Sequence, residues 1–240
     1  MYTLVLVRHG ESEWNKKNLF TGWTDVGITP EGVKDARLMG KKLSEEGYEF
    51  PVAFTSVLKR ASLTLELILE EMNSSQTQVI RDWRLNERHY GKLQGKSKIG
   101  ILDELEWKQV HAFRRSYKTR PPQLETDDPR HPANDSKYSN VPEHMLPRGE
   151  SLEDTYNRVI PYLQEEILPA LKTHNKALIS AHGNTLRVLL KYFNDLTDNQ
   201  IEGVEFAIGE ILVYRLDEDF KVISKEFIAS KTNVKYGGDM

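Results

Sequence analysis

The sequence predicts an α/β fold, a three-layer sandwich in which helices flank a mostly parallel central sheet. Two short apolar segments, residues 2–7 and 177–181, each have the character of a buried strand, and each is followed by a turn that carries a His-Gly pair. Between and after them, apolar runs alternate with segments of helical periodicity. Because ligands bind at the carboxyl ends of parallel strands, we expect both histidines at one site.

The remaining elements follow the same alternation. Residues 30–46 are predicted to form a helix that has Thr29 as its cap, Pro30 in its first turn and Gly47 after its end. Residues 52–55 are apolar enough for a strand, and residues 58–72 have apolar side chains at helical spacing. Downstream we expect a capped helix, a strand, a helix and two further strands over residues 151–171, 177–181, 185–193, 211–216 and 222–227.

The chain of 240 residues suits a single domain, residues 1–240. Residues 96–148 interrupt the alternation because they are rich in Pro, Asp, Arg and His and have only a modest helical pattern, over residues 102–113. Such a long irregular stretch is either a binding lid or a disordered spacer, and its tryptophan and arginines favour a lid-like insertion. The tail, residues 229–240, lacks periodicity and is expected to be mobile, with an active-site flap as the alternative.

The composition excludes several classes of protein. A formal net charge of -3 gives no basis for nucleic-acid binding, so any anion site must be local. The absence of cysteine rules out disulfides and thiolate chemistry, and the histidines lack metal-ligand spacing, so we expect no metal. No apolar run is long enough to span a membrane and no leader is recognisable, from which we expect a cytoplasmic protein. The oligomeric state stays open, with a homo-oligomer allowed.

The two His-Gly turns have the chemistry of a phosphate site. A histidine beside an apolar run is more often structural, but here glycine allows close approach of a ligand, and the following Glu-Ser or Asn-Thr can cap a helix whose amides attract anions. A histidine that attacks phosphorus needs a neutral ring nitrogen and fixed cationic donors. His9 has Arg8 beside it, and Arg60 starts a helix after the second strand, although a solvated arginine is the alternative for Arg60.

Two further segments are candidates. The segment around Glu87 is a polar surface loop in the simplest interpretation; if Glu87 instead faces the phosphate site, nearby negative charge favours its protonated form and suits it to move a proton. Arg114 and Arg115 are either a solvated pair or anchors for a phosphorylated substrate that also bears a carboxylate.

Together these residues resemble a known family. Residues 5–15, 20–25, 55–61, 85–95, 114–117 and 181–184 are similar to the sequence blocks of the cofactor-dependent phosphoglycerate mutases, within the histidine phosphatase superfamily. The resemblance spans nearly the whole chain. It implies interconversion of 3-phosphoglycerate and 2-phosphoglycerate through a phosphohistidine, primed by 2,3-bisphosphoglycerate without a metal.

The resemblance also implies roles for individual residues. His9 carries the phosphoryl group, Arg8, Arg60 and His182 bind it in transfer, and Glu87 donates and accepts the proton. The substrate, a small phosphorylated molecule, is held by Ser12, Asn15, Thr21, Gly22, Tyr90, Lys98, Arg114, Arg115, Gly183 and Asn184.

The chain departs from the family pattern in three places. Residues 207–211 read Ala-Ile-Gly-Glu-Ile where the mutases have Pro-Thr-Gly-x-Pro, residues 96–97 differ from the usual Leu-Asn, and residues 147–151 resemble phosphatase relatives. The alternatives are therefore a phosphatase that uses the same His9 intermediate and an enzyme shifted toward bisphosphoglycerate synthesis or breakdown. A silent regulator is disfavoured because His9, Glu87 and His182 are all present.

Overall fold

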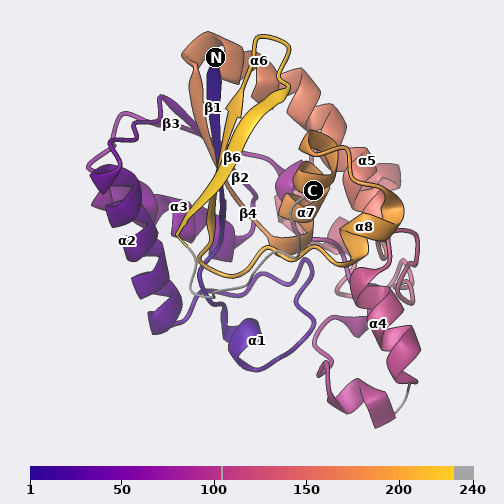
Figure 1. Ribbon diagram of the computed structural model, residues 1–240. Helices are drawn as coiled ribbons and strands as arrows, with labels where there is room; N and C mark the ends of the chain where they lie inside the picture. Colours follow the sequence, from indigo (N-terminus) through magenta and orange to yellow (C-terminus); the bar gives the residue numbers. More distant parts are fainter. Residues whose placement is uncertain (104, 230–240) are drawn as a thin grey trace.

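A mostly parallel sheet of six strands organises the protein (Figure 1). The computed structural model describes residues 1–103 and 105–229, so the predicted tail lies outside the described residues except for Ala229. The strand order is β3-β2-β4-β1-β5-β6, in which β3, β2, β4 and β1 are mutually parallel and β5 runs antiparallel to both β1 and β6. The order brings β1 and β4, distant in sequence, side by side at the centre.

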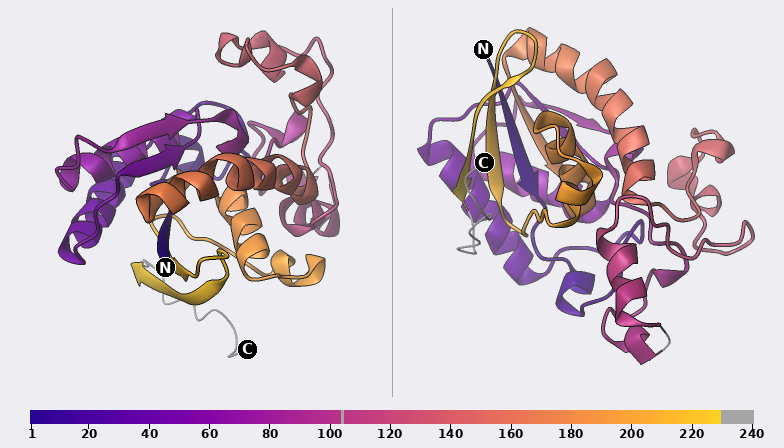
Figure 2. Two further views of the ribbon diagram at one scale, coloured as in Figure 1. Left: turned by 90° about the horizontal axis from the view of Figure 1, so that it is seen from above. Right: turned by 45° about the vertical axis from the view of Figure 1, so that its right-hand side comes forward.

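Helices cover both faces of this sheet, which confirms the predicted sandwich (Figure 2). Alternate side chains of the central strands enter two separate cores, as strand geometry requires. Leu4, Leu6 and Ile179 pack with α5, α6 and α7 on one face. Val5 and Leu178 pack with α2 and α3 on the other. The central strands are buried on both sides, which explains why they are apolar at consecutive positions.

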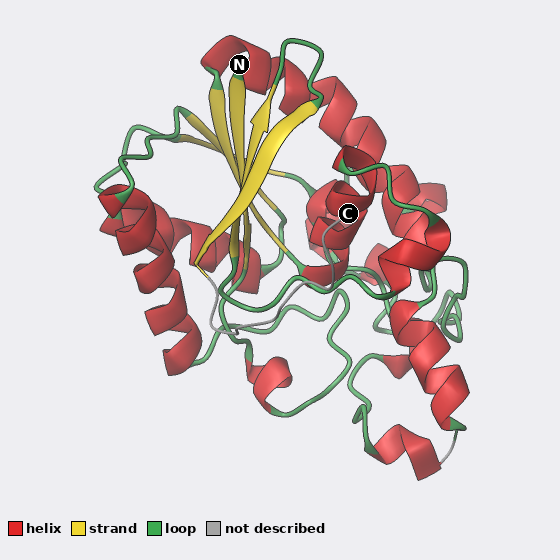
Figure 3. Ribbon diagram, in the orientation of Figure 1, coloured by secondary structure: helices red, strands yellow, loops and turns green. Residues whose placement is uncertain are grey.

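Most predicted elements are present with bounds shifted by a residue or two (Figure 3). Three short elements, α1, β3 and α8, have four or five residues each, which is too few for a recognisable periodicity in the sequence. The strands are β1 (Tyr2–Arg8), β2 (Val52–Thr55), β3 (Gln78–Arg81), β4 (Lys176–Ala181), β5 (Ile211–Leu216) and β6 (Val222–Ala229). The helices are α1 (Glu13–Lys16), α2 (Pro30–Glu45), α3 (Lys59–Glu71), α4 (Trp107–Arg115), α5 (Leu152–Tyr162), α6 (Leu168–His174), α7 (Gly183–Phe193) and α8 (Asp198–Glu202).

The helix predicted for residues 151–171 is a continuous helical run that contains a π turn. Ser151 caps its start through a capping box with Asp154, and the π turn Leu163–Ile167 joins α5 to α6. Pro169 lies two residues after this turn and has no N–H to donate to it. A locally widened helix is one way to accommodate the missing bond. No helix among residues 1–103 and 105–229 is long and apolar enough to cross a membrane.

The insertion, residues 96–148, packs against the body through two small apolar clusters. Ile101, Val110 and Phe113 contact Phe20, and Tyr138 packs against Trp23 of the same early loop. Apart from α4, the described part of the insertion consists of loops and single 3₁₀ turns, visible as the mainly green and short red segments of Figure 3. These contacts bring α4 to the carboxyl edge of the sheet, and the lid-like role of the insertion stays a prediction.

Candidate active site

The two predicted histidine turns meet at the carboxyl ends of β1 and β4. Arg8 pairs with Ala181 across the parallel ladder, and the His9 amide donates to the Ala181 carbonyl at 3.1 Å. The rings of His9 and His182 lie 5.1 Å apart, centroid to centroid, in an edge arrangement. Both side chains are almost fully buried. The structure therefore brings the two turns together at one edge of the sheet.

The His9 ring presents one free nitrogen. Its Nδ1 lies 2.8 Å from the Gly10 carbonyl, which can only accept, so Nδ1 carries the proton and Nε2 keeps its lone pair. Burial, with the charges of Arg60 and Arg8, lowers the pKa of His9 well below its usual value. The ring is therefore a neutral base and nucleophile with a fixed tautomer.

Residues beyond its own turn hold His9 in place. The Gly10 amide donates to the Thr64 hydroxyl at 3.1 Å, and that hydroxyl donates to the Arg60 carbonyl at 2.7 Å. A side chain at Gly10 would collide with the Gly32 backbone at the start of α2, since an added Cβ would lie 2.2 Å from that carbonyl oxygen. Close approach of α2 thus requires glycine here, in addition to any approach by a ligand.

The His182 turn differs from its prediction. Asn184 and Thr185 were expected to cap the following helix, but α7 already begins at Gly183 and the cap position, His182, makes no side-chain cap bond. The Thr185 hydroxyl instead donates to the Asn86 carbonyl, and the Asn184 amide donates to the Glu87 carboxylate at 3.2 Å. A carboxylate from another segment occupies the positive end of α7 because tertiary contacts bring it there. On the other turn, Ser12 does cap α1, as predicted.

Arg60 and Arg8 reach the site as predicted. Arg60, in the first turn of α3, is 1% exposed and donates to the carbonyls of Gly22 and Thr24 at 2.7 and 3.0 Å. Burial lowers the pKa of Arg60 to about 10, which leaves it charged at neutral pH. Arg8 donates to the Phe206 carbonyl, and its Nε has no hydrogen-bond partner within the described chain. Both guanidinium groups therefore carry positive charge beside His9, with donor capacity to spare at Arg8.

The Glu87 segment is fixed by a buried ion pair. Arg158 of α5 donates to the carbonyls of Asn86 and Glu87 at 3.0 Å each, and it forms a salt bridge with Glu150 at 2.7 Å. Glu150 also accepts from the His89 amide at 2.7 Å. Both charged partners are at least nine-tenths buried, so the pair is costly to break. The Gly-Glu-Ser sequence, noted as phosphatase-like, thus supports the Glu87 loop and the start of α5.

A single cavity gathers most of the predicted site residues. It is lined by the predicted Arg8, His9, Asn15, Thr21, Gly22, Arg60, Glu87, Tyr90, Lys98, Arg114, Arg115, Gly183 and Asn184, and also by Arg187, Glu205 and Phe206. Two predicted residues lie outside this lining. They are His182, which is fully buried with its ring 5.1 Å from that of His9, and Ser12, whose hydroxyl bonds to Asn15 at 2.7 Å.

Arg187 is the cavity residue of most consequence that sequence reasoning missed. It is 3% exposed and donates to Asn184 Oδ1 at 2.8 Å and to the carbonyls of Ile201 and Arg115 at 2.6 and 3.2 Å. Burial, followed by the charges of Arg88 and Arg115, lowers its pKa to about 9. Its spacing of three residues from Asn184 on one helix was the available signal, because residues three apart share a helix face.

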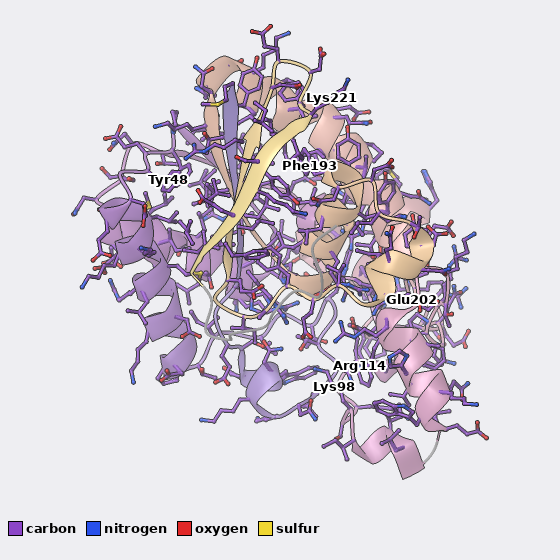
Figure 4. All side chains as sticks on the ribbon, in the orientation of Figure 1. Tyr48, Lys98, Arg114, Phe193, Glu202 and Lys221 are labelled. Carbon is purple, nitrogen blue, oxygen red and sulfur yellow. The ribbon has the colours of Figure 1, made fainter. Side chains whose placement is uncertain are left out.

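The insertion contributes cations from two of its segments. Lys98 precedes its first 3₁₀ turn and Arg114 lies in the last turn of α4; Figure 4 shows the two residues near each other. Burial first, and Arg114 among the nearby charges, lowers the pKa of Lys98. The solvated-pair alternative for Arg114 and Arg115 is disfavoured, since both line the cavity. Trp107, however, is 59% exposed and does not line it, so the tryptophan was not a valid sign of a lid.

The departure at residues 207–211 forms a tight turn. Gly209 has a φ of 77°, and the Glu210 carboxylate folds back to accept from the Ala207 amide at 2.6 Å. Glu210 is fully buried and does not line the cavity. The expected new carboxylate therefore acts mainly on its own turn, although its charge raises the pKa of Arg8, against the larger opposite effect of burial.

The other histidines are held structurally or exposed. The His89 ring accepts from the Gly91 amide at 3.0 Å, His131 accepts from the Ala133 amide at 3.1 Å, and His111 and His144 lie at the surface. His174 is half-buried at the end of α6. Among residues 1–103 and 105–229, no three His, Asp or Glu side chains are grouped so as to hold a metal ion.

Solved structures share this architecture. The chain is similar to a mycobacterial glucosyl-3-phosphoglycerate phosphatase with a TM-score of 0.72 and 20% identity, over 95% of this chain and 97% of the other. At that identity the likeness concerns the fold alone.

Curated relatives are closer in sequence. The chain is 46% identical to the 2,3-bisphosphoglycerate-dependent phosphoglycerate mutase of Pasteurella multocida over 225 residues, which covers 94% of this chain and 99% of that protein. The enzyme of the same name from Neisseria meningitidis serogroup A matches with the same identity and coverage. The model of the histidine phosphatase superfamily, branch 1, matches residues 4–130 and 123–226. Because these matches run from β1 into β6, through both histidine turns and the insertion, the chain belongs to branch 1 of the histidine phosphatase superfamily.

Proposed function

We propose that this chain interconverts 3-phosphoglycerate and 2-phosphoglycerate through a phosphohistidine at His9, primed by 2,3-bisphosphoglycerate. The observation that carries the proposal is the donor set of the cavity, which joins a neutral histidine nucleophile to cationic side chains from several separate elements. The 46% identity with two mutases over nearly their whole length supports it independently.

The cavity has the chemistry to hold a polyanion. Arginine and lysine side chains of β1, α3, the insertion and α7 converge on it: Arg8, Arg60, Lys98, Arg114, Arg115 and Arg187. Arg8 and Arg187 each have a buried Nε without a hydrogen-bond partner within the described residues, as expected where an anion completes the donor set. Phosphate and carboxylate groups match this geometry, so the residues fit 2,3-bisphosphoglycerate. When bound, that molecule supplies the phosphoryl group that primes His9.

His9 Nε2 is the nucleophile in this proposal. As the bond from nitrogen to phosphorus forms, the bond from phosphorus to the departing oxygen breaks, and the ring takes on positive charge. The proton on Nδ1 remains donated to the Gly10 carbonyl, which steadies that charge. Arg8 and Arg60 offset the negative charge of the transferring group from fixed positions.

Glu87 moves the proton that this transfer requires. Its carboxylate is 8% exposed, lines the cavity, and is aimed by the amides of Arg88 and Asn184 at 2.7 and 3.2 Å. A protonated Glu87 gives its proton to the departing substrate oxygen, and the carboxylate takes a proton from the hydroxyl that next attacks phosphohistidine. Enclosure by the insertion keeps the bisphosphorylated molecule in the cavity while it reorients between the two phosphoryl transfers.

Partners and location complete the proposal. The chain acts on a small phosphorylated acid, without nucleic acid, membrane or metal, and it works in the cytoplasm, where its glycolytic substrates are found. A homo-oligomer is compatible with this activity, because the cationic side chains that line the cavity all come from one chain.

The decisive test mixes the protein with 3-phosphoglycerate in chelator-treated buffer, with and without catalytic 2,3-bisphosphoglycerate, and follows 2-phosphoglycerate and free phosphate together. We expect 2-phosphoglycerate that depends on the primer and little phosphate. Phosphate release without isomerisation would instead identify a phosphatase that uses the same histidine.

A further inference from the structure

We propose that Ser56 is a positioning residue that fixes the tautomer of His182, so that His182 Nδ1–H is directed as a donor toward the phosphoryl group on His9. This inference rests on the proposed phosphohistidine function. Ser56 follows β2 and is fully buried, and its hydroxyl lies 2.7 Å from His182 Nε2.

The hydrogen-bond inventory decides which atom donates. The Leu58 amide already donates to the Ser56 hydroxyl at 3.2 Å, and Ser56 makes no other side-chain bond among the described residues. If Ser56 donates to Nε2, then only the Nδ1–H of His182 is left without a partner. If His182 donates instead, both the Ser56 hydrogen and the Nδ1 lone pair are left unpaired in a buried place. Since an unpaired buried polar group is costly, the first arrangement is favoured.

One ring nitrogen of His182 is left without a protein partner among the described residues. His182 Nδ1 is buried and has no hydrogen-bond partner in the part of the chain that is described, and its ring lies 5.1 Å from that of His9. The two neutral rings thus have opposite tautomers. His9 keeps its Nδ1 proton on a backbone carbonyl and attacks with Nε2, whereas His182 accepts at Nε2 and offers a donor at Nδ1.

Neutrality of His182 makes its tautomer matter. Burial, followed by the charge of Arg60, holds its pKa well below the usual value, so one ring nitrogen lacks a proton at neutral pH. A lone pair at Nδ1 would face phosphoryl oxygens with like charge, and a proton there makes a hydrogen bond to them. The Ser56 hydroxyl, which touches no substrate, thereby decides whether His182 Nδ1 attracts or repels the phosphoryl oxygens.

The first measurement is a long-range ¹H–¹⁵N correlation spectrum of the unphosphorylated full-length protein, with His182 identified by its loss in His182→Gln. We expect the pattern of a neutral ring protonated at Nδ1. A proton on Nε2 would overturn the proposal. This readout needs no turnover and does not depend on which phosphorylated molecule the enzyme uses.

The second measurement compares Ser56→Ala with Ser180→Ala. Ser180 is also a fully buried serine, and its hydroxyl donates to the Ala61 carbonyl at 3.1 Å rather than to either histidine. We expect Ser56→Ala to mix the His182 tautomers and to slow ³²P transfer from 2,3-bisphosphoglycerate to His9 by about 10- to 100-fold, less than the 10²–10³ typical of a lost donor, because part of the population keeps the Nδ1 proton. Ser180→Ala should change neither.

The outcomes separate the two proposals. Equal spectra and transfer rates in Ser56→Ala and Ser180→Ala would refute the role of Ser56. Absence of ³²P on His9 in the unmodified protein would refute the proposed function, and with it the positioning role in transfer, while the spectrum would still test the tautomer. If Ser56→Ala folds poorly, Ser56→Cys replaces it: a thiol donates more weakly, so an unchanged tautomer and rate would count against the proposal.

Discussion

The two histidine turns are alike in sequence and different in support. Each follows a buried strand and each contains His-Gly, yet His9 has its proton fixed by its own turn, while His182 is fixed by Ser56 from another strand end. His9 lines the cavity, whereas His182 is fully buried beside His9 and does not line it. A repeated motif therefore places two histidine rings at one site, but the hydrogen-bond partners of each ring determine its role.

The largest effect should come from His9, the member of the pair that lines the cavity. His9→Ala removes the nucleophile and should lower turnover by about 10⁴-fold or more, with the fold retained, because loss of a covalent catalyst leaves only binding and electrostatic catalysis. Coupled mutase assay and thermal unfolding check this. His144→Ala, at an exposed histidine, is the control. Turnover retained in His9→Ala would show that His9 is not the nucleophile and that the two histidines do not differ in role.

Glu87 connects the two turns, since it is held at the start of α7 and faces the cavity. Glu87→Gln keeps an oxygen for the Asn184 amide and loses the proton, so kcat should fall by about 10²- to 10⁴-fold. Glu150→Gln is the matched control, at another buried carboxylate that accepts from a backbone amide. We expect it to reduce stability more than kcat. Equal losses of kcat would show that both act only as supports.

Arg187 tests how far the His182 turn depends on tertiary support. Arg187→Met removes donors to Asn184 and to two backbone carbonyls. We expect KM to rise about tenfold and the free energy of unfolding to fall by about 1.5–3 kcal/mol, as for hydrogen bonds to a charged group. Urea unfolding and steady-state kinetics measure both. Arg37→Met, in a half-exposed ion pair with Glu70, should cost about 1 kcal/mol or less and leave KM unchanged.

The two turns should behave alike in acid. Buried His9, His182 and His89 have lowered pKa values, about 3 for His89, because burial disfavours their charged forms. Unfolded histidine takes up a proton near pH 6.5, so acid favours the unfolded state. The stability is complete above that pH and is lost as the pH falls toward the folded values, by at most about 1.4 kcal/mol per pH unit for each histidine.

Urea unfolding between pH 7.5 and 5 measures this slope. His89→Gln leaves the catalytic histidines intact and should reduce the change of unfolding free energy with pH by the contribution of one histidine. His144→Gln, at the surface, should leave that pH dependence unchanged. A slope in His89→Gln equal to that of the parent protein would show that His89 is protonated in the folded state.

The strands and the main helices could be predicted from the sequence because their signals are local. Apolar runs gave β1 and β4, and the cap of Thr29 with Pro30 and Gly47 bounded α2 to within a residue. The two His-Gly turns could be placed together because parallel strands share a carboxyl edge. The identities of His9, Arg60 and Glu87 as candidates needed no coordinates, since charge and nucleophilicity belong to the residue types.

Only the tertiary structure decided how these groups are oriented and what supports them. That Arg187 lines the cavity, that Glu87 replaces a local cap at α7, and that Ser56 meets His182 all depend on contacts between residues 14 to 126 positions apart. Periodicity and capping report neighbours within one element. Which nitrogen of a buried histidine carries its proton is set by a partner from another strand, and no pattern along the chain encodes that distance.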